Sequence, residues 1–191
     1  DAVYQIVENA PEPLGSTMKD LIERRLADPT LPMEEAFSQH LKEEELELPA
    51  GQFALFMNSM YAVDAYVRDY FRKAALDALL AEKLPVTVFG EGWEKYSCGD
   101  EHSLRREPAV PFALSFERIA KAHVLLNVSP IFNRGMHDRV PAGMANHAVV
   151  LTDENPYLRR TFTDGKELLF YSLEKPDTLC EQAERTLTDV R

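Results

Sequence analysis

The chain has 191 residues, of which 45% are hydrophobic and 28% are charged, and its formal net charge is −11. This composition is typical of a globular protein. The negative charge argues against a dedicated nucleic-acid or anionic-membrane binder. We expect no membrane span, because the sequence has no run of 18 apolar residues, and no signal segment opens the chain.

The charge is distributed unevenly along the chain. Residues 1–50 contain twelve acidic and four basic residues, whereas residues 102–139 contain six basic and three acidic residues. A locally positive segment in an acidic protein suits a small anionic ligand better than a polyanion.

The two cysteines, Cys98 and Cys180, lie far apart and do not have the spacing of metal ligands. We therefore expect reduced thiols in a cytoplasmic protein. Because the sequence begins with Asp1 rather than Met, we also expect it to be a fragment of a longer protein.

Residues 1–51 are expected to form a helical extension. Pro29 and Pro32 separate two predicted helices. The first of these carries apolar residues three and four positions apart, namely Met18, Leu21, Ile22 and Leu26. The second helix begins near Met33 and ends in an acidic run that we expect to be solvated.

Residues 52–84 contain the longest stretch with helical periodicity, and we expect one long connecting helix there. Its apolar stripe is more typical of a core than of a cofactor site. Arg68 and Arg72 lie one turn apart, and ion pairs with Asp64 or Asp69 are the simpler explanation for them.

Residues 85–191 alternate between short apolar runs and helical segments. The predicted strands are 86–89, 109–114, 123–128, 148–152 and 167–171, and residues 94–108 are predicted to be a long polar loop. The predicted helices are 116–122, 137–146, a short one started by Asp153 or Asn155, and 176–188. This alternation predicts an α/β fold, with a Rossmann-like parallel sheet covered by helices on both faces.

Within this domain, residues 127–151 are predicted to run from the end of a strand through a polar loop to a helix and a second strand. This layout presents backbone N–H groups to an anion. The free donors at the start of the helix are expected on Met136, His137 and Asp138.

The basic residues of this stretch are candidate phosphate ligands. Arg139 has the guanidinium fork that binds phosphate, and Arg134 is a second candidate, with ion pairing to an acidic residue as the alternative for either arginine. His137 could bind a phosphate or a sugar, or it could cap the helix.

Four uncharged or acidic residues are further candidates. Gly135 would allow close approach of a diphosphate, or it is a turn glycine. Asn127 and Ser129 stand at the carboxyl end of a strand, where α/β proteins bind ligands. Asp153 is either a helix N-cap or a sugar ligand.

Two residues outside this stretch could also approach a ligand. Trp93 follows the first strand and could contact a base or an acceptor, with plain packing as the alternative. His102 lies in the predicted loop 94–108. The chain shows no Ser/His/Asp, Cys/His or Walker pattern, so it offers no candidate catalytic residue.

Several spaced motifs resemble the CgeB-like (spore maturation protein) glycosyltransferases in their C-terminal domain. They are V-T-V-F-G-E-G-W (86–93), V-P-F (110–112), A-K-A-H-V-L-L-N-V-S-P-I-F (120–132), G-M-H-D-R-V (135–140), G-M-A-N (143–146), V-V-L-T-D (149–153) and D-G-K-E-L-L-F-Y (164–171).

The resemblance implies the C-terminal half of a GT-B fold, in which two Rossmann-like domains face a cleft. It also implies that this half binds a nucleoside diphosphate sugar as substrate, with no metal and no cofactor, through helix N-termini and basic side chains. The acceptor site and any catalytic base would lie on a partner N-terminal half, so this chain alone should not turn over. The implied activity is that of a hexosyltransferase-type enzyme.

Two positions depart from the pattern of the relatives. Many members of the wider group carry a glutamate that bonds the donor ribose where this chain has Ala142, and glycine is common where it has His147. These departures favour an alternative hypothesis, a degenerate module that binds a nucleotide or sugar phosphate, or serves assembly, without catalysis.

Overall fold

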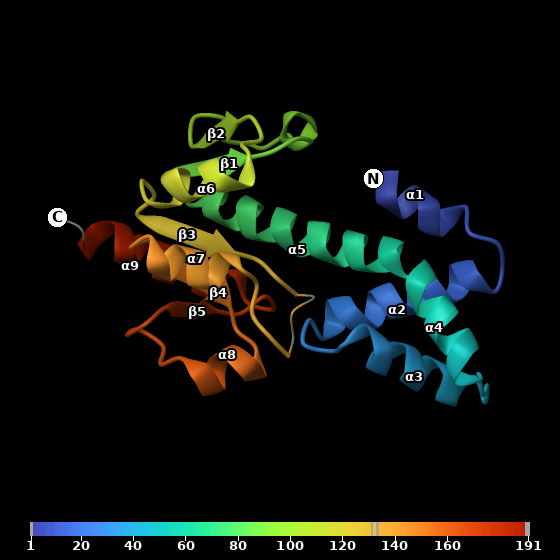
Figure 1. The fold of residues 1–191 in the computed structure, drawn as a ribbon. Helices are drawn as coiled ribbons and strands as arrows, with labels where there is room; N and C mark the ends of the chain where they lie inside the picture. Colours follow the sequence, from blue (N-terminus) through green and yellow to red (C-terminus); the bar gives the residue numbers. More distant parts are fainter. Residues whose placement is uncertain (1, 131, 133, 190–191) are drawn as a thin grey trace. The chain divides into compact units, whose positions relative to one another are not determined.

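The computed structural model describes residues 2–130, 132 and 134–189. The chain divides into two compact units, residues 1–71 and 72–191, and each is considered by itself. The division falls inside helix α5 (Tyr61–Ala81), which is shown in green in Figure 1. The segment boundaries expected at residues 51 and 84 stay predictions.

The first unit is helical. It contains α1 (Ala2–Glu8), α2 (Leu14–Ala27), α3 (Met33–Glu43), α4 (Ala50–Ser59) and the first half of α5. Apolar residues at helical spacing form its core, which includes Met18, Leu21, Ile22, Phe37, Leu41, Val63 and Val67. Phe37 stacks on Phe56 of α4, with ring centroids 4.4 Å apart.

Ion pairs add to this core. Arg25 is 2% exposed and pairs with Asp64. His40 of α3 lies with Nδ1 2.8 Å from the Asp20 carboxylate and Nε2 3.2 Å from the Thr17 hydroxyl, so it links α3 to α2.

The single long helix expected over 52–84 is wrong, because α4 ends at Ser59 and α5 starts at Tyr61. The Ser59 hydroxyl donates to the Leu55 carbonyl, a local bond of the kind that competes with helix continuation.

The second unit is α/β. After α5 it contains β1 (Val86–Phe89), a 3-10 turn η1 (Trp93–Lys95), β2 (Leu104–Glu107), α6 (Phe112–Ile119), β3 (Val124–Asn127), α7 (Arg139–Ala145), β4 (Val149–Asp153), α8 (Pro156–Thr161), β5 (Leu169–Tyr171) and α9 (Pro176–Asp189). All strand pairs named here are parallel, which confirms the predicted Rossmann-like α/β fold.

The strands form two sheets among the described residues, one of β1 and β2 and one in the order β3-β4-β5. Helix α7 packs on β3 and β4, and α9 packs on β4 and β5 (Figure 1). The cluster under α7 consists of Val140, Val150, Leu158, Leu168 and Phe170. Each such side chain contributes roughly 1.5–3 kcal/mol when it is fully buried.

Gly143 sets how closely α7 approaches the sheet. A Cβ atom on this residue would lie 2.6 Å from Cγ2 of Val150 and 2.8 Å from Cδ2 of Leu125, both shorter than a normal van der Waals contact. A larger residue here would therefore force the side chains of Val150 and Leu125 to move.

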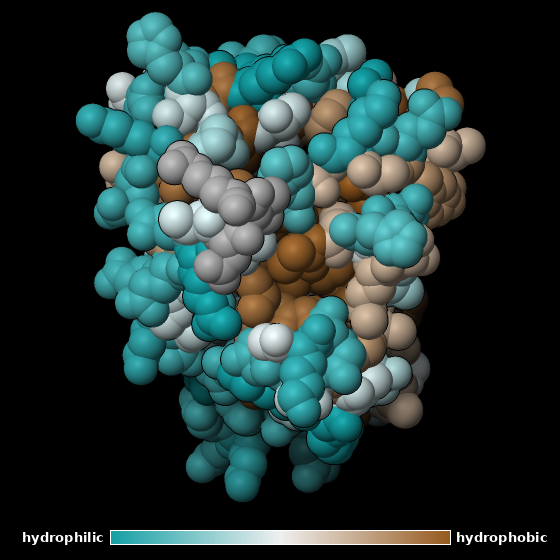
Figure 2. Space-filling view, turned by 90° about the vertical axis from the view of Figure 1, so that its left-hand side faces the viewer, coloured by the Kyte–Doolittle hydropathy of each residue, from teal (hydrophilic) through white to brown (hydrophobic). Residues whose placement is uncertain are grey.

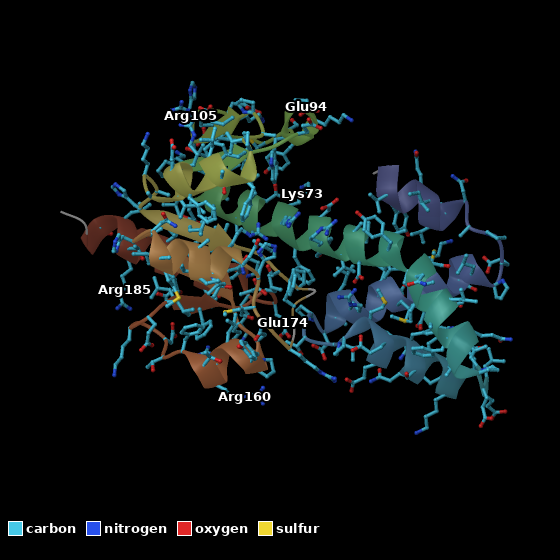
Figure 3. The ribbon with its side chains drawn as sticks, viewed as in Figure 1. Lys73, Glu94, Arg105, Arg160, Glu174 and Arg185 are labelled. Atoms are coloured by element: carbon cyan, nitrogen blue, oxygen red, sulfur yellow. The ribbon has the colours of Figure 1, made fainter. Side chains whose placement is uncertain are left out.

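The second strand is not where the sequence predicted it. The expected strand 109–114 is wrong, because α6 begins at Phe112 directly after Pro111, and β2 lies inside the predicted loop. Strand β2 is polar and needs only one buried side chain, Leu104, which packs with Leu76 and Leu80 of α5. Figure 3 shows Arg105 of this strand at the surface, where it pairs with Glu107 at 2.5 Å.

The second unit also exposes apolar side chains. Figure 2 shows one face of the molecule, with a hollowed apolar area. The exposed large hydrophobic residues of the second unit are Phe89, Phe112, Leu114, Phe132 and Val149. Phe112 of α6 is 70% exposed. Across residues 2–130, 132 and 134–189, no helix is both long enough and apolar enough to cross a membrane.

Candidate anion-binding site

The candidate site lies at the carboxyl ends of β3 and β4. The register pairs Asn127 with Thr152, so the polar ends of the two strands lie beside each other. Asn127, 1% exposed, donates from Nδ2 to the Thr152 hydroxyl at 2.9 Å. Its Oδ1 accepts from the Ser129 hydroxyl at 3.0 Å.

Tyr171 of β5 completes this network from the other side of β4. Its hydroxyl donates to the Asn127 carbonyl at 3.0 Å, and burial raises its pKa well above the ordinary value for tyrosine. The side-chain groups of Asn127 and Ser129 are thus committed to one another and to neighbouring strands, and they fix the point at which the chain leaves the sheet.

Asp153 ends β4 and is 3% exposed. Its carboxylate accepts a 2.7 Å hydrogen bond from the Ser129 backbone N–H. Burial raises the pKa of this carboxyl to about 7, although the Ser129 N–H, its own N–H and the charge of Arg139 act in the opposite direction. The N-cap of α8 is Asn155, whose Oδ1 accepts from the Leu158 N–H at 2.8 Å.

Asn155 also shapes the loop that follows β3. Its Nδ2 donates to the carbonyls of Phe132 (2.9 Å) and Gly135 (3.1 Å). Residues 131 and 133 of this loop, which fall within the motif that the sequence analysis quoted, lie outside the described residues. A Cβ atom on Gly135 would meet no described atom within 4 Å, so neither packing nor a positive φ requires glycine there.

The basic residues follow directly in the chain. Arg134 is exposed, and Arg139 is half-buried as the first residue of α7. The N–H groups of Val140 and Ala142 already donate within the helix, to the carbonyls of His137 and Asp138. The backbone N–H groups of residues 136–138, which the sequence predicted as anion donors, come before this hydrogen-bonded turn of α7.

His137 faces two partners through one ring nitrogen. Nδ1 lies against the Asp138 carboxylate and 3.2 Å from the Arg139 backbone N–H. A ring that carries a proton on Nδ1 donates to Asp138, whereas a neutral ring with its proton on Nε2 accepts from Arg139 at Nδ1 and caps α7. Burial lowers the pKa of His137, helped by the charges of Arg139 and Arg72 and opposed by Asp138.

One of the charges that lower the pKa of His137 belongs to Arg72, for which the sequence favoured a simple ion pair. Arg72 of α5 lies more than sixty positions earlier in the chain, yet its positive charge acts on the same imidazole. Thr152, Tyr171 and the loop-shaping role of Asn155 were missed as well. Only the N-P pair at 155–156 carried a local signal, that of a helix start.

Trp93 and His102 lie in the β1–β2 part of the unit. Trp93 packs beside Leu76, Leu80 and Leu104, and its Nε1 donates to the Phe89 carbonyl at 3.3 Å. The exposed His102 donates its backbone N–H to Asp100 at 3.1 Å. The structure therefore brings Asn127, Ser129 and Asp153 together at the ends of β3 and β4, and it gives Trp93 a packing role.

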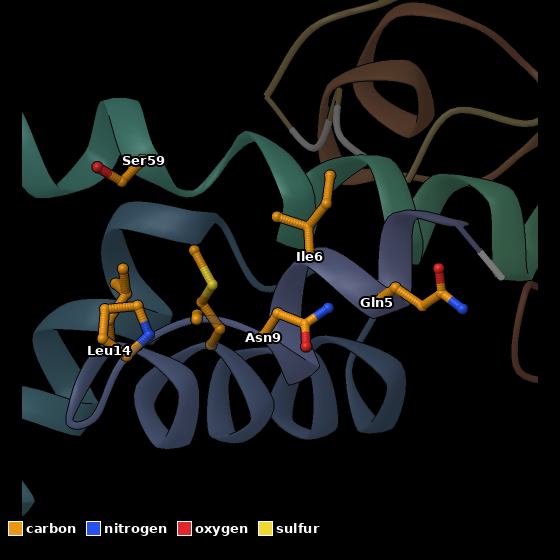
Figure 4. A pocket seen from close by; sticks show the side chains of 8 residues that line it. Gln5, Ile6, Asn9, Leu14 and Ser59 are labelled. Atoms are coloured by element: carbon orange, nitrogen blue, oxygen red, sulfur yellow. The ribbon is translucent and has the colours of Figure 1, made fainter.

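An open groove in the first unit has a different character. Its lining consists of Gln5, Ile6, Asn9, Ala10, Pro11, Leu14, Met18 and Ser59 (Figure 4). With no charged side chain in the lining, it does not suit a phosphate. Among the described residues, no three His, Cys, Asp or Glu side chains come together in a way that could hold a metal ion.

Comparison with known proteins assigns the family. No curated protein and no solved structure matches the chain. A family model described as glycosyl transferase-like matches residues 68–190, which include the second half of α5, both sheets and the candidate site. This match spans well over half of the sequence, and the chain therefore belongs to the glycosyl transferase-like family.

Proposed function

We propose that the second unit binds the nucleoside diphosphate sugar of a glycosyl transfer reaction at the carboxyl ends of β3 and β4. The observation that carries this proposal is the position of Arg139 and His137. Both follow the β3 loop at the edge of a parallel sheet, inside the region matched by the glycosyl transferase-like family. Ligands of α/β proteins bind at this edge.

In this proposal Arg139 binds the diphosphate as a two-pronged donor. Arg134, His137 and the backbone N–H groups of residues 136–138 add further donors, and Gly135 leaves room for the ligand. Asn127 and Ser129 hold the loop rather than the ligand, since their side chains are bonded within the network. Catalysis would consist of stabilising the departing nucleoside diphosphate.

We also propose a place within the family. The motif L-N-V-S-P-I-F and the segment G-M-H-D-R-V favour the CgeB-like group, and with it a second Rossmann-like half that supplies the acceptor site.

Cys98 and Cys180 are free thiols, which supports a reducing, cytoplasmic compartment.

A degenerate binding module is the second candidate, and Ala142 is the observation that favours it. The relatives' glutamate at this position is replaced by a side chain that cannot bond a ribose. Under this alternative, the same edge would bind a phosphate weakly or not at all.

Calorimetric titration of the 191-residue chain separates the two. UDP, GDP, ADP, UDP-glucose, GDP-mannose and ADP-glucose are titrated into the wild type, Arg139→Ala and the control Arg160→Ala on α8 (Figure 3). We expect saturable binding that Arg139→Ala weakens by at least about fivefold, or roughly 1 kcal/mol, as for loss of a charge-assisted hydrogen bond. Arg160→Ala should leave the affinity unchanged.

Two results would count against donor binding. Failure of all six compounds to bind would favour the degenerate module. Equal weakening by the two arginine substitutions would show that the ligand responds to the overall charge rather than to the edge of the sheet.

A further inference from the structure

A buried carboxyl group lies directly behind the proposed ligand site. Asp153 is 3% exposed, and its carboxylate accepts a hydrogen bond from the Ser129 backbone N–H at 2.7 Å. This bond joins the end of β4 to the first residues of the loop that leads to Arg139. An ionised carboxylate in such a position depends on nearby positive charge, because burial removes its solvation by water.

The groups around Asp153 come from each neighbouring element. Helix α7 packs on β4, the strand that ends at Asp153, and begins at Arg139, whose positive charge favours the ionised carboxylate. Strand β5 contributes Tyr171, which is paired with Asp153 in the sheet register and is itself influenced by that carboxyl. Strand β3 and its loop contribute the uncharged Asn127 and Ser129, and Glu154, the next residue in the chain, pairs with Arg159.

Arg139 is therefore shared between two anions whenever a phosphate is bound. A phosphate at its guanidinium neutralises the cation that acts on Asp153 and brings further negative charge close to the carboxylate. Both effects disfavour the ionised form. A buried carboxylate in this situation lowers its free energy most readily by taking a proton from the solvent.

We propose that Asp153 takes up a proton when a phosphate-bearing ligand binds at Arg139, so that donor binding and protonation of this carboxyl are coupled. The inference rests on the proposed function and adds to it a regulation of the same site by pH. Without ligand the pKa of Asp153 is about 7, so the group is close to half-ionised at neutral pH and any further rise changes its proton occupancy.

The direction of the coupling follows from linkage. A ligand that raises a pKa binds more tightly at lower pH, because the protonated protein is the form it prefers. The affinity should rise as the pH falls from about 9 to 7, by up to tenfold per pH unit. Asp153 acts through Arg139 and is a positioning residue rather than a ligand contact.

The test measures proton uptake directly. UDP-glucose, GDP-mannose and ADP-glucose have a diphosphate whose charge is constant in this pH range, so any proton taken up enters the protein. Titration at pH 7.5 in two buffers with different enthalpies of ionisation gives the number of protons per ligand. We expect about half a proton for the wild type, since about a quarter of Asp153 is already protonated there and most of it becomes so.

Asp153→Asn supplies the matched variant, because an amide oxygen can still accept from the Ser129 N–H and cannot titrate. Its proton uptake should fall close to zero, and its affinity should change little with pH. A repeat at pH 8.5 separates Asp153 from His137, whose lowered pKa leaves it neutral at that pH. If Asp153→Asn folds poorly, the proton uptake of the wild type can still be measured at both pH values.

The outcomes distinguish the coupling from the proposed function. Binding without proton uptake in the wild type would overturn the coupling alone, and so would uptake that Asp153→Asn leaves intact. Failure of all three nucleotide sugars to bind would refute donor binding and the coupling together. Uptake that disappears in Asp153→Asn while binding persists would establish the coupling.

Discussion

The buried carboxyl of Asp153 should make the second unit less stable as the pH rises, even with no ligand present. Its pKa is about 7 in the folded chain and 3.8 is the ordinary value expected when unfolded. The folded state therefore holds this proton more tightly than the unfolded state does. Stability from the group is fully present below about pH 4 and is lost progressively as the pH rises through 7.

The size of the effect follows from the difference of roughly three pKa units. At about 1.4 kcal/mol per unit, ionisation of Asp153 costs the fold about 4 kcal/mol above pH 7. In Asp153→Asn the proton-dependent cost is absent. The variant should match the wild type near pH 4 and exceed it by up to about 4 kcal/mol at pH 8.

The chain has one tryptophan, Trp93, which packs in the second unit and reports its unfolding by fluorescence. Urea unfolding curves between pH 4 and 9 give the difference between the two proteins at each pH, which cancels the contribution of other titrating groups. Glu174→Gln, at an exposed position (Figure 3), is the control and should stay within about 0.5 kcal/mol of the wild type throughout. A difference that is flat with pH, or an Asp153→Asn variant less stable than the wild type at pH 8, would refute the reasoning.

Two further predictions concern the packing and the end of α7. Gly143→Ala should lower the unfolding free energy by up to about 2 kcal/mol in the same assay, because crowding against Val150 costs about 1–3 kcal/mol and helix propensity returns only about 1 kcal/mol; a variant more stable than the wild type would contradict it. His147→Gly should raise the unfolding free energy by about 1 kcal/mol, since His147 has a left-handed φ of 63°. Ala145→Gly, at an exposed helical position, should lower it by a similar amount, and a less stable His147→Gly variant would show that the histidine side chain is needed.

The sequence predicted the parts of the fold that depend on local pattern. The apolar runs around Leu125 and Val150 and the helix between them were expected within a few residues of their observed bounds. Strand β2 was missed because three of its four residues are charged and only Leu104 needs to be buried. Such a strand is specified by its pairing with β1, which a local pattern does not contain.

The buried network of the site could not be predicted for a similar reason. The bond between Asn127 and Thr152 depends on the register of two strands, and the bond from Tyr171 depends on the order β3-β4-β5. From the sequence alone, these residues are only polar groups near strand ends. Arg72 shows the same limit, because its effect on His137 arises from tertiary structure across more than sixty residues.

The two departures from the family pattern have different consequences. His147 follows α7 in the left-handed conformation that glycine favours, and the N–H groups of His147 and Ala148 bond back to the carbonyls of Met144 and Gly143. His147 therefore has the backbone conformation that a glycine would readily adopt, and we expect the histidine to affect stability rather than the shape of the site. At position 142 the expected glutamate side chain is missing altogether, and no backbone conformation of Ala142 can replace its carboxylate. If the proposed donor site is correct, its affinity should therefore depend on the cations at Arg139 and Arg134, and weak binding would be explained by Ala142 rather than by His147.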